Sequence, residues 1–104
     1  MLVEYRAPGD PGRVYSLRGG RNRLGRDDDR DVVLDDERVS GEHGIITITE
    51  DRARYLDSSS NGSMVDGQPV IGDVAELRSG SVLSLGGTSL VFLLVPVACL
   101  PGGA

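Results

Sequence analysis

The sequence predicts one all-β domain, an antiparallel sandwich or barrel of about ten short strands. The chain carries 15 glycines and 5 prolines, spread so evenly that no long helical segment remains. No apolar pattern with a helical period continues over ten residues, whereas short apolar or alternating runs recur between turn residues. At 104 residues the chain has room for a single domain with a substantial core.

The predicted strands follow one another at close spacing. The first five are expected at residues 2–6, 13–17, 22–26, 32–34 and 44–49. The next five are expected at residues 53–57, 63–67, 75–77, 82–86 and 89–95. In the fifth segment, GIITIT, Gly44, Ile46 and Ile48 fall on one face of the strand. Thr47 and Thr49 fall on the other face, which is the alternation of a half-buried strand.

Turn residues separate these strands. A turn is expected in APGDPG (7–12), and the Gly-containing pairs at 61–62, 66–67, 79–80 and 86–87 are typical of tight turns. After about Val95 the segment PVACLPGGA has no strand pattern. We therefore expect the domain to occupy residues 1–95 and a flexible C-terminal tail to occupy residues 96–104.

Charge and composition exclude several classes of protein. The net charge of −5 argues against a general nucleic-acid binder, which needs a basic face. The only cysteine, Cys99, has no partner for a disulfide or a metal site, which favours a reducing compartment. The N-terminus shows no signal peptide, and the apolar run at 90–100 is too short to span a bilayer. These observations predict a soluble cytoplasmic domain without membrane insertion.

The basic residues are all arginines, 11 in number, which indicates the coding bias of a bacterial source. Arginine is also the side chain best shaped to hold a phosphate or carboxylate through two parallel hydrogen bonds. An acidic protein can therefore still hold one anion where an arginine and backbone amides converge.

The short spacing between Ser40 and His43 raises the possibility of a hydrolase. A catalytic triad also needs a carboxylate that orients the imidazole and an oxyanion hole, and the chain contains no G-x-S-x-G turn. We therefore predict that the protein is not an enzyme.

The acidic run RDDDRD (26–31) has the alternating carboxylates of a calcium loop. Val32 stands where the loop requires glycine, and Arg38 stands where it requires a bidentate glutamate. The run is therefore interpreted as a solvated loop. The glycine-rich motifs that bind nucleotide phosphates are absent as well, so we expect neither a metal nor a cofactor.

Three loops of small hydrogen-bonding residues lie at predicted strand ends. They occur in the segments LGRDDDRDVVL (24–34), RVSGEHGIITI (38–48) and YLDSSSNGSMVDGQPV (55–70). Binding residues usually lie on loops at one end of a rigid sandwich. If these loops meet, one arginine, two hydroxyls and nearby backbone amides would form a compact phosphate site.

Taken in order, these motifs resemble those of the forkhead-associated (FHA) domain, a module that recognises phosphothreonine peptides. The matching residues are Gly25-Arg26, Ser40-x-x-His43, Ser60-Asn61-Gly62, Asp66-Gly67 and the segment LGGTSLVF (85–92). Order and spacing agree from about residue 22 to residue 93. The resemblance implies an all-β antiparallel sandwich of about eleven strands, the FHA/SMAD-like class, with residues 1–95 as the FHA domain.

The resemblance also implies roles for individual residues. Arg26 would grip the phosphate, and Ser40 and Ser60 would donate their hydroxyls to it. The backbone N–H of Gly41 would add a further donor, and Asn61 would hold the main chain of the peptide. These roles are physically reasonable, because a phosphate with a charge near −2 favours charge-assisted hydrogen bonds.

Other positions would support or select the ligand. By the same resemblance His43 would orient Ser40, and Gly25 and Gly62 would provide tight backbone geometry. Arg38 matches a position that contacts the third residue after the phosphothreonine in some relatives, which would favour an acidic side chain there. The alternative is an exposed arginine that pairs with an aspartate of the segment DDE (35–37).

Two residues depart from the family pattern. Gly41 stands where many relatives carry arginine, asparagine or lysine, so one side-chain donor to the phosphate is missing. A charged hydrogen bond contributes about 1.5–3 kcal/mol, so weaker binding is expected. Ser63, where threonine is common, is a milder change.

The resemblance therefore implies a phosphothreonine-dependent binding module in kinase or secretion signalling. Its partner would be a phosphothreonine-containing protein or peptide, either a Ser/Thr kinase or a substrate of one. The alternative on the same fold is a phospho-independent interaction or oligomerisation module, with Gly41 as the first sign of lost phosphate binding.

Overall fold

The computed structural model describes residues 1–5, 12–50 and 52–94. This part of the chain contains eleven strands and no helix, which confirms the predicted all-β class. The strands are β1 (Leu2–Tyr5), β2 (Val14–Tyr15), β3 (Gly20–Gly25), β4 (Val32–Val33), β5 (Gly44–Thr49), β6 (Arg52–Asp57), β7 (Ser63–Val65), β8 (Gln68–Val70), β9 (Val74–Leu77), β10 (Val82–Leu85) and β11 (Thr88–Phe92). The predicted tail at 96–104 and most of the predicted turn at 7–12 lie outside the described residues.

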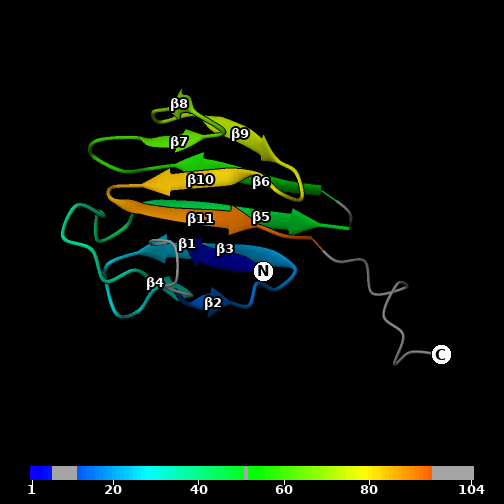
Figure 1. Ribbon diagram of the computed structural model, residues 1–104, viewed down its shortest axis with the longest axis horizontal. Helices are drawn as coiled ribbons and strands as arrows, with labels where there is room; N and C mark the ends of the chain where they lie inside the picture. Colours follow the sequence, from blue (N-terminus) through cyan, green and yellow to red (C-terminus); the bar gives the residue numbers. More distant parts are fainter. Residues whose placement is uncertain (6–11, 51, 95–104) are drawn as a thin grey trace.

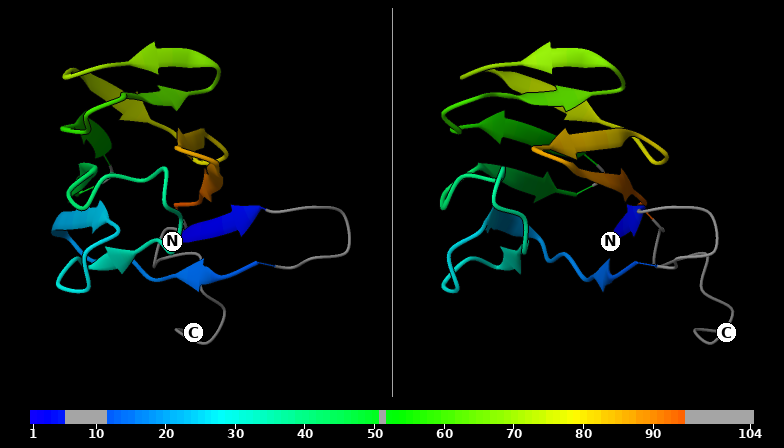
Figure 2. Two further views of the ribbon diagram at one scale, coloured as in Figure 1. Left: turned by 90° about the vertical axis from the view of Figure 1, so that its left-hand side faces the viewer. Right: turned by 60° about the vertical axis from the view of Figure 1, so that its left-hand side comes forward.

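The strands form two sheets that pack face to face (Figures 1 and 2). One sheet has the order β2-β1-β11-β10-β7-β8, and the other has the order β4-β3-β5-β6-β9. Side chains alternate between the two faces of a strand, and β6 shows this with Ala53, Tyr55 and Asp57 buried. Among the residues described, no helix is available that could cross a membrane.

The core lies between the sheets and consists of aliphatic and aromatic side chains from both. Its buried members are Leu2, Leu24, Val32, Leu34, Val39, Ile46, Ala53, Tyr55, Val65, Val70, Leu77, Leu83, Leu85, Leu90 and Phe92. Burying a large apolar side chain of this kind contributes about 1.5–3 kcal/mol. The core therefore holds the two sheets in a fixed relation and gives the loops a rigid base.

Two features of the sheets differ from the sequence-based expectation. β8 was not among the predicted strands. Its Pro69 cannot donate a ladder hydrogen bond, but β8 lies at the edge of its sheet, where a proline is tolerated. β4 runs parallel to β3, with Leu24 opposite Val32, whereas the other eight strand pairs described are antiparallel. The Asp66-Gly67 turn between β7 and β8 has positive φ at both residues, as a tight hairpin turn requires.

The strand register brings three loops to one end of the sandwich. Leu24 near the end of β3 pairs with Gly44 at the start of β5, and Gly44 pairs with Asp57 at the end of β6. The loops that follow β3, precede β5 and follow β6 therefore leave the sheet side by side, at the end that faces the viewer in the left view of Figure 2.

Candidate functional site

Three loops at this end of the sandwich are joined by hydrogen bonds around Ser40. The backbone N–H of Arg26 donates to the Ser40 carbonyl oxygen at 3.0 Å, and the N–H of Asp27 donates to the Gly41 carbonyl oxygen at 3.2 Å. From the third loop, the N–H of Ser60 donates to the Ser40 hydroxyl oxygen at 3.3 Å. The structure thus brings together three residues that the sequence motifs singled out separately, Arg26, Ser40 and Ser60.

The Arg26 side chain is exposed and has no carboxylate partner within the described residues. Its guanidinium donates only to the Glu37 carbonyl oxygen, with a separation of 3.4 Å. Other arginines of this region do form ion pairs, namely Arg18 and Arg23 with Asp31, Arg30 with Asp29 and Glu42, and Arg38 with Asp36. Arg26 therefore retains an unneutralised charge beside the hydroxyl-bearing loops, although three aspartates follow it in the sequence.

Glycines allow the loops to approach one another closely. A Cβ atom at Gly25 would overlap the carbonyl group of Gly41 in the neighbouring loop. Gly62 has φ +88°, in the left-handed region, and a Cβ there would lie 2.7 Å from the Ile71 side chain. Both positions therefore require glycine for geometric reasons.

His43 is fully buried and connects the second loop to the third. Its Nδ1 accepts a hydrogen bond from the Ser40 N–H at 3.0 Å, which places the ring proton on Nε2. Nε2 then donates to the Gly62 carbonyl oxygen at 3.2 Å and lies 3.1 Å from the Ser63 hydroxyl oxygen. Burial lowers the pKa of His43, and the Gly62 carbonyl and the Asp57 carboxylate partly offset this effect. Neither ring nitrogen bonds to the Ser40 hydroxyl, so the two side chains do not form a nucleophile–base pair.

A buried polar network of Tyr55, Asp57 and Ser63 contacts His43 through the Ser63 hydroxyl. The Ser63 hydroxyl donates to Asp57 Oδ1 at 2.6 Å, so the Tyr55 hydroxyl, also 2.6 Å away, donates to Ser63. Asp57 Oδ1 also accepts from the Ser59 hydroxyl at 2.7 Å, and its Oδ2 accepts from the Gly72 N–H at 2.9 Å. The network thus anchors the loop that carries Ser60 to β6 and to the loop after β8.

The charge state of this network follows from its hydrogen bonds. Burial raises the pKa of the Tyr55 hydroxyl. Burial also acts to raise the pKa of Asp57, but the Gly72 N–H and the hydroxyls of Ser63 and Ser59 outweigh it and lower that pKa. Sequence analysis did not identify Asp57; the alternation of β6, with Tyr55 facing inward, places it on the buried face and could have done so.

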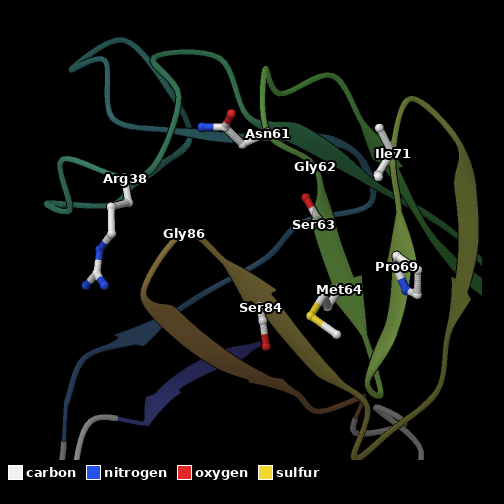
Figure 3. Close-up of a pocket in the computed structure, with 9 residues that line it drawn as sticks. All are labelled: Arg38, Asn61, Gly62, Ser63, Met64, Pro69, Ile71, Ser84 and Gly86. Carbon is white, nitrogen blue, oxygen red and sulfur yellow. The ribbon is translucent and has the colours of Figure 1, made fainter.

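A pocket of about 490 Å³ lies beside the loops (Figure 3). It is lined by Arg38, Asn61, Gly62, Ser63, Met64, Pro69, Ile71, Ser84 and Gly86. In Figure 3 Arg38 lies at the left and Asn61 at the top, across from the apolar side chains of Ile71 and Pro69 at the right. The Arg38 guanidinium pairs with Asp36 at 3.2 Å, which is the alternative partner that the sequence offered.

The chain is similar to known protein domains over most of its length. Residues 9–96 match the family model described as the cytoplasmic domain of the inner membrane component of T3SS. The glycogen accumulation regulator GarA of Mycobacterium tuberculosis is 34% identical over 97 residues, which are 92% of this chain and 58% of GarA. The oxoglutarate dehydrogenase inhibitor of Corynebacterium efficiens is 33% identical over 99 residues, which are 94% of this chain and 68% of that protein. The chain thus spans little more than half the length of GarA.

Solved structures show the same architecture. A structure from work on phosphothreonine-dependent FHA domain interactions superposes with a TM-score of 0.81 at 32% identity, covering 92% of this chain and 96% of that chain. The FhaA FHA domain, solved in complex with the intracellular domain of Rv3910, has a TM-score of 0.76 at 34% identity. The match covers 86% of this chain and 94% of that chain. The FHA domain of CT664 from Chlamydia trachomatis has a TM-score of 0.80 at 27% identity. The match covers 91% of this chain and 97% of that chain.

Proposed function

Because this chain belongs to the forkhead-associated (FHA) family, we propose that it binds a phosphothreonine-containing segment of a partner protein and catalyses no reaction itself. One observation carries the proposal. The Arg26 guanidinium has no carboxylate partner in the described part of the chain, and it belongs to the loop that is hydrogen-bonded to Ser40 and, through Ser40, to Ser60. An arginine without a carboxylate partner, on a loop joined to two loops that carry serine hydroxyls, suits a phosphate monoester.

In this proposal each loop makes a different contribution. Arg26 holds the phosphate through charge-assisted hydrogen bonds, and the hydroxyls of Ser40 and Ser60 and the N–H of Gly41 donate to the same group. Asn61, at the mouth of the pocket, holds the peptide main chain through its side-chain amide. The Ser40 hydroxyl oxygen accepts a hydrogen bond from the Ser60 N–H at 3.3 Å, so the hydroxyl proton is available to donate to a phosphate oxygen.

His43, Gly25 and Gly62 act as positioning residues. His43 holds the backbone of Ser40 and the carbonyl of Gly62 at 3.0 and 3.2 Å, and thereby fixes the distance between two phosphate-binding loops. This rigidity favours binding, because the loops lose little conformational freedom when the ligand arrives.

The partner is a protein phosphorylated on threonine, either a Ser/Thr kinase or a kinase substrate, and the site of action is the cytoplasm, where kinases have ATP. We place the complete binding unit within residues 1–95. Arg38, which lines the pocket beside Asn61, would exchange its Asp36 partner for an acidic side chain at the third position after the phosphothreonine.

Calorimetry with a phosphothreonine peptide chosen from an oriented library, together with its unphosphorylated and phosphoserine forms, tests the proposal. We expect a preference for phosphothreonine that is lost in Arg26→Ala. Arg54→Ala is the matched control, since Arg54 is an exposed arginine in the middle of β6, away from these loops. Equal affinity for the phosphorylated and unphosphorylated peptides would sink the proposal, as would an undiminished preference in Arg26→Ala. For Arg38, replacing Asp by Ala at the third position of the peptide should weaken wild-type binding and leave Arg38→Ala unaffected.

A further inference from the structure

The carboxylate of Asp27 lies directly against Gly41. A Cβ atom built on Gly41 would be 2.7 and 2.8 Å from the two carboxylate oxygens of Asp27. The backbone holds this arrangement, because the Asp27 N–H donates to the Gly41 carbonyl oxygen and the Arg30 N–H donates to the Asp27 carbonyl oxygen, both at 3.2 Å. A negative charge therefore lies beside one of the backbone donors that the proposed function assigns to the phosphate.

The Asp27 carboxylate has no cationic partner, whereas three other aspartates of these loops do. Asp29, Asp31 and Asp36 each pair with an arginine at 3.0–3.2 Å. Within residues 1–5, 12–50 and 52–94, no arginine lies within 4.0 Å of the Asp27 carboxylate, and no hydrogen bond reaches it. Its charge thus remains uncompensated within this part of the chain.

We propose that Asp27 sets both the affinity and the ligand preference of the phosphate site. Its carboxylate weakens binding of the phosphate itself, and it strengthens binding of ligands that carry a basic side chain next to the phosphothreonine. The ligand class is therefore a phosphothreonine segment with an arginine or lysine close to the phosphorylated residue. This inference rests on the proposed function of the loops.

The physical basis is the electrostatic field of the Asp27 carboxylate beside the phosphate site. A carboxylate and a phosphate with a charge near −2 repel one another by an amount that corresponds to about a tenfold change in affinity at roughly 6 Å in a water-like dielectric. Gly41 increases the effect, because no side chain at that position neutralises Asp27. A cationic group of the ligand placed beside Asp27 adds an attraction that offsets part of this repulsion and recovers part of the affinity.

Calorimetry on Asp27→Asn tests the first part, with a phosphothreonine peptide whose other residues are uncharged as the probe. The substitution keeps the backbone hydrogen bonds and the size of the side chain. We expect about tenfold tighter binding than in the wild type, with the difference shrinking in 0.5 M salt because exposed charges are screened. Glu50→Gln is the matched control: it removes one charge at the opposite end of β5 and should change the affinity less than twofold.

A second peptide series tests the ligand preference. A single arginine is moved through the positions on both sides of the phosphothreonine, and each peptide is titrated against the wild type and Asp27→Asn. We expect at least one position at which arginine strengthens wild-type binding about threefold and leaves Asp27→Asn nearly unchanged, because a single positive charge interacts with Asp27 half as strongly as a phosphate of charge −2 at the same distance.

The possible results separate this inference from the function on which it rests. If the wild type prefers the phosphorylated peptide but Asp27→Asn binds no more tightly, the role of Asp27 is refuted and the proposed function stands. A gain from arginine that is equal in both proteins refutes the ligand preference. If neither protein distinguishes phosphorylated from unphosphorylated peptides, both the function and the inference fail.

Discussion

Removing the charge of Asp57 should loosen the phosphate-binding end of the sandwich without disturbing the apolar core. Asp57 accepts three hydrogen bonds, from the Ser63 hydroxyl at 2.6 Å, the Ser59 hydroxyl at 2.7 Å and the Gly72 N–H at 2.9 Å. In Asp57→Asn one carboxylate oxygen becomes an NH₂ group that faces a donor. Hydrogen bonds to a charged group contribute about 1.5–3 kcal/mol each, and the loss of one or two of them predicts a destabilisation of about 3 kcal/mol.

The pH dependence of stability gives a second measure of how much the Asp57 carboxylate stabilises the fold. The folded-state pKa of Asp57 is lowered, so the native protein favours the ionised carboxylate more than the unfolded chain does. Its contribution to stability is fully present above the unfolded-state pKa of about 3.9, and it is lost as the pH falls from there through the folded-state pKa. Asp57→Asn removes this contribution at every pH and should flatten the acid limb of the stability curve.

Urea unfolding followed by circular dichroism, at pH 7 and at several values between 5 and 2.5, measures both effects. Asp28→Asn is the matched control, because Asp28 is exposed and lies outside the hydrogen-bond network of Asp57. A loss of less than about 1 kcal/mol in Asp57→Asn, or an acid limb as steep as that of the wild type, would refute the reasoning. Phosphopeptide affinity should fall with stability, since Ser59 and the loop that contains Ser60 lose their anchor.

Three further predictions follow from the same loops. His43 has a lowered folded-state pKa, so stability should decline as the pH falls below the unfolded value of about 6.5, and urea titrations of His43→Asn should show no such decline. Gly25→Ala should cost about 1–3 kcal/mol of stability and weaken phosphopeptide binding, because its Cβ would overlap the Gly41 carbonyl. Gly19→Ala is the control, since open space surrounds Gly19, and it should change neither property. Equal thermal stability of the two variants would contradict this prediction. Gly41→Arg should bind a phosphothreonine peptide more tightly in calorimetry, because the atoms nearest its Cβ belong to the Asp27 carboxylate, which can shift, and the guanidinium adds a donor to the phosphate. Weaker binding in a folded variant would argue against that geometry.

The strand content and the order of the motifs were predictable from the sequence because they depend on local patterns. Alternation along GIITIT identified β5, and the glycine pairs identified the hairpins at Asp66-Gly67 and Gly86-Gly87. The strand β8 was missed: it has only three residues and contains Pro69, and only its place in the sheet shows that it is an edge strand, where a proline is tolerated. The parallel pairing of β4 with β3 was also beyond local reasoning, because two residues carry no mark of direction.

The sequence by itself determined which residues belong to the candidate site, since Gly25-Arg26, Ser40-x-x-His43 and Ser60-Asn61-Gly62 stand in the order and spacing of the family. Only the tertiary structure decided how charges are distributed within it. Arg26 lacks a carboxylate partner in the described chain, and the unpaired carboxylate that lies against Gly41 is Asp27. The reason is that ion pairing depends on distances of a few ångströms between loops. Those distances are set by the register of β3, β5 and β6, which no stretch of the sequence encodes alone.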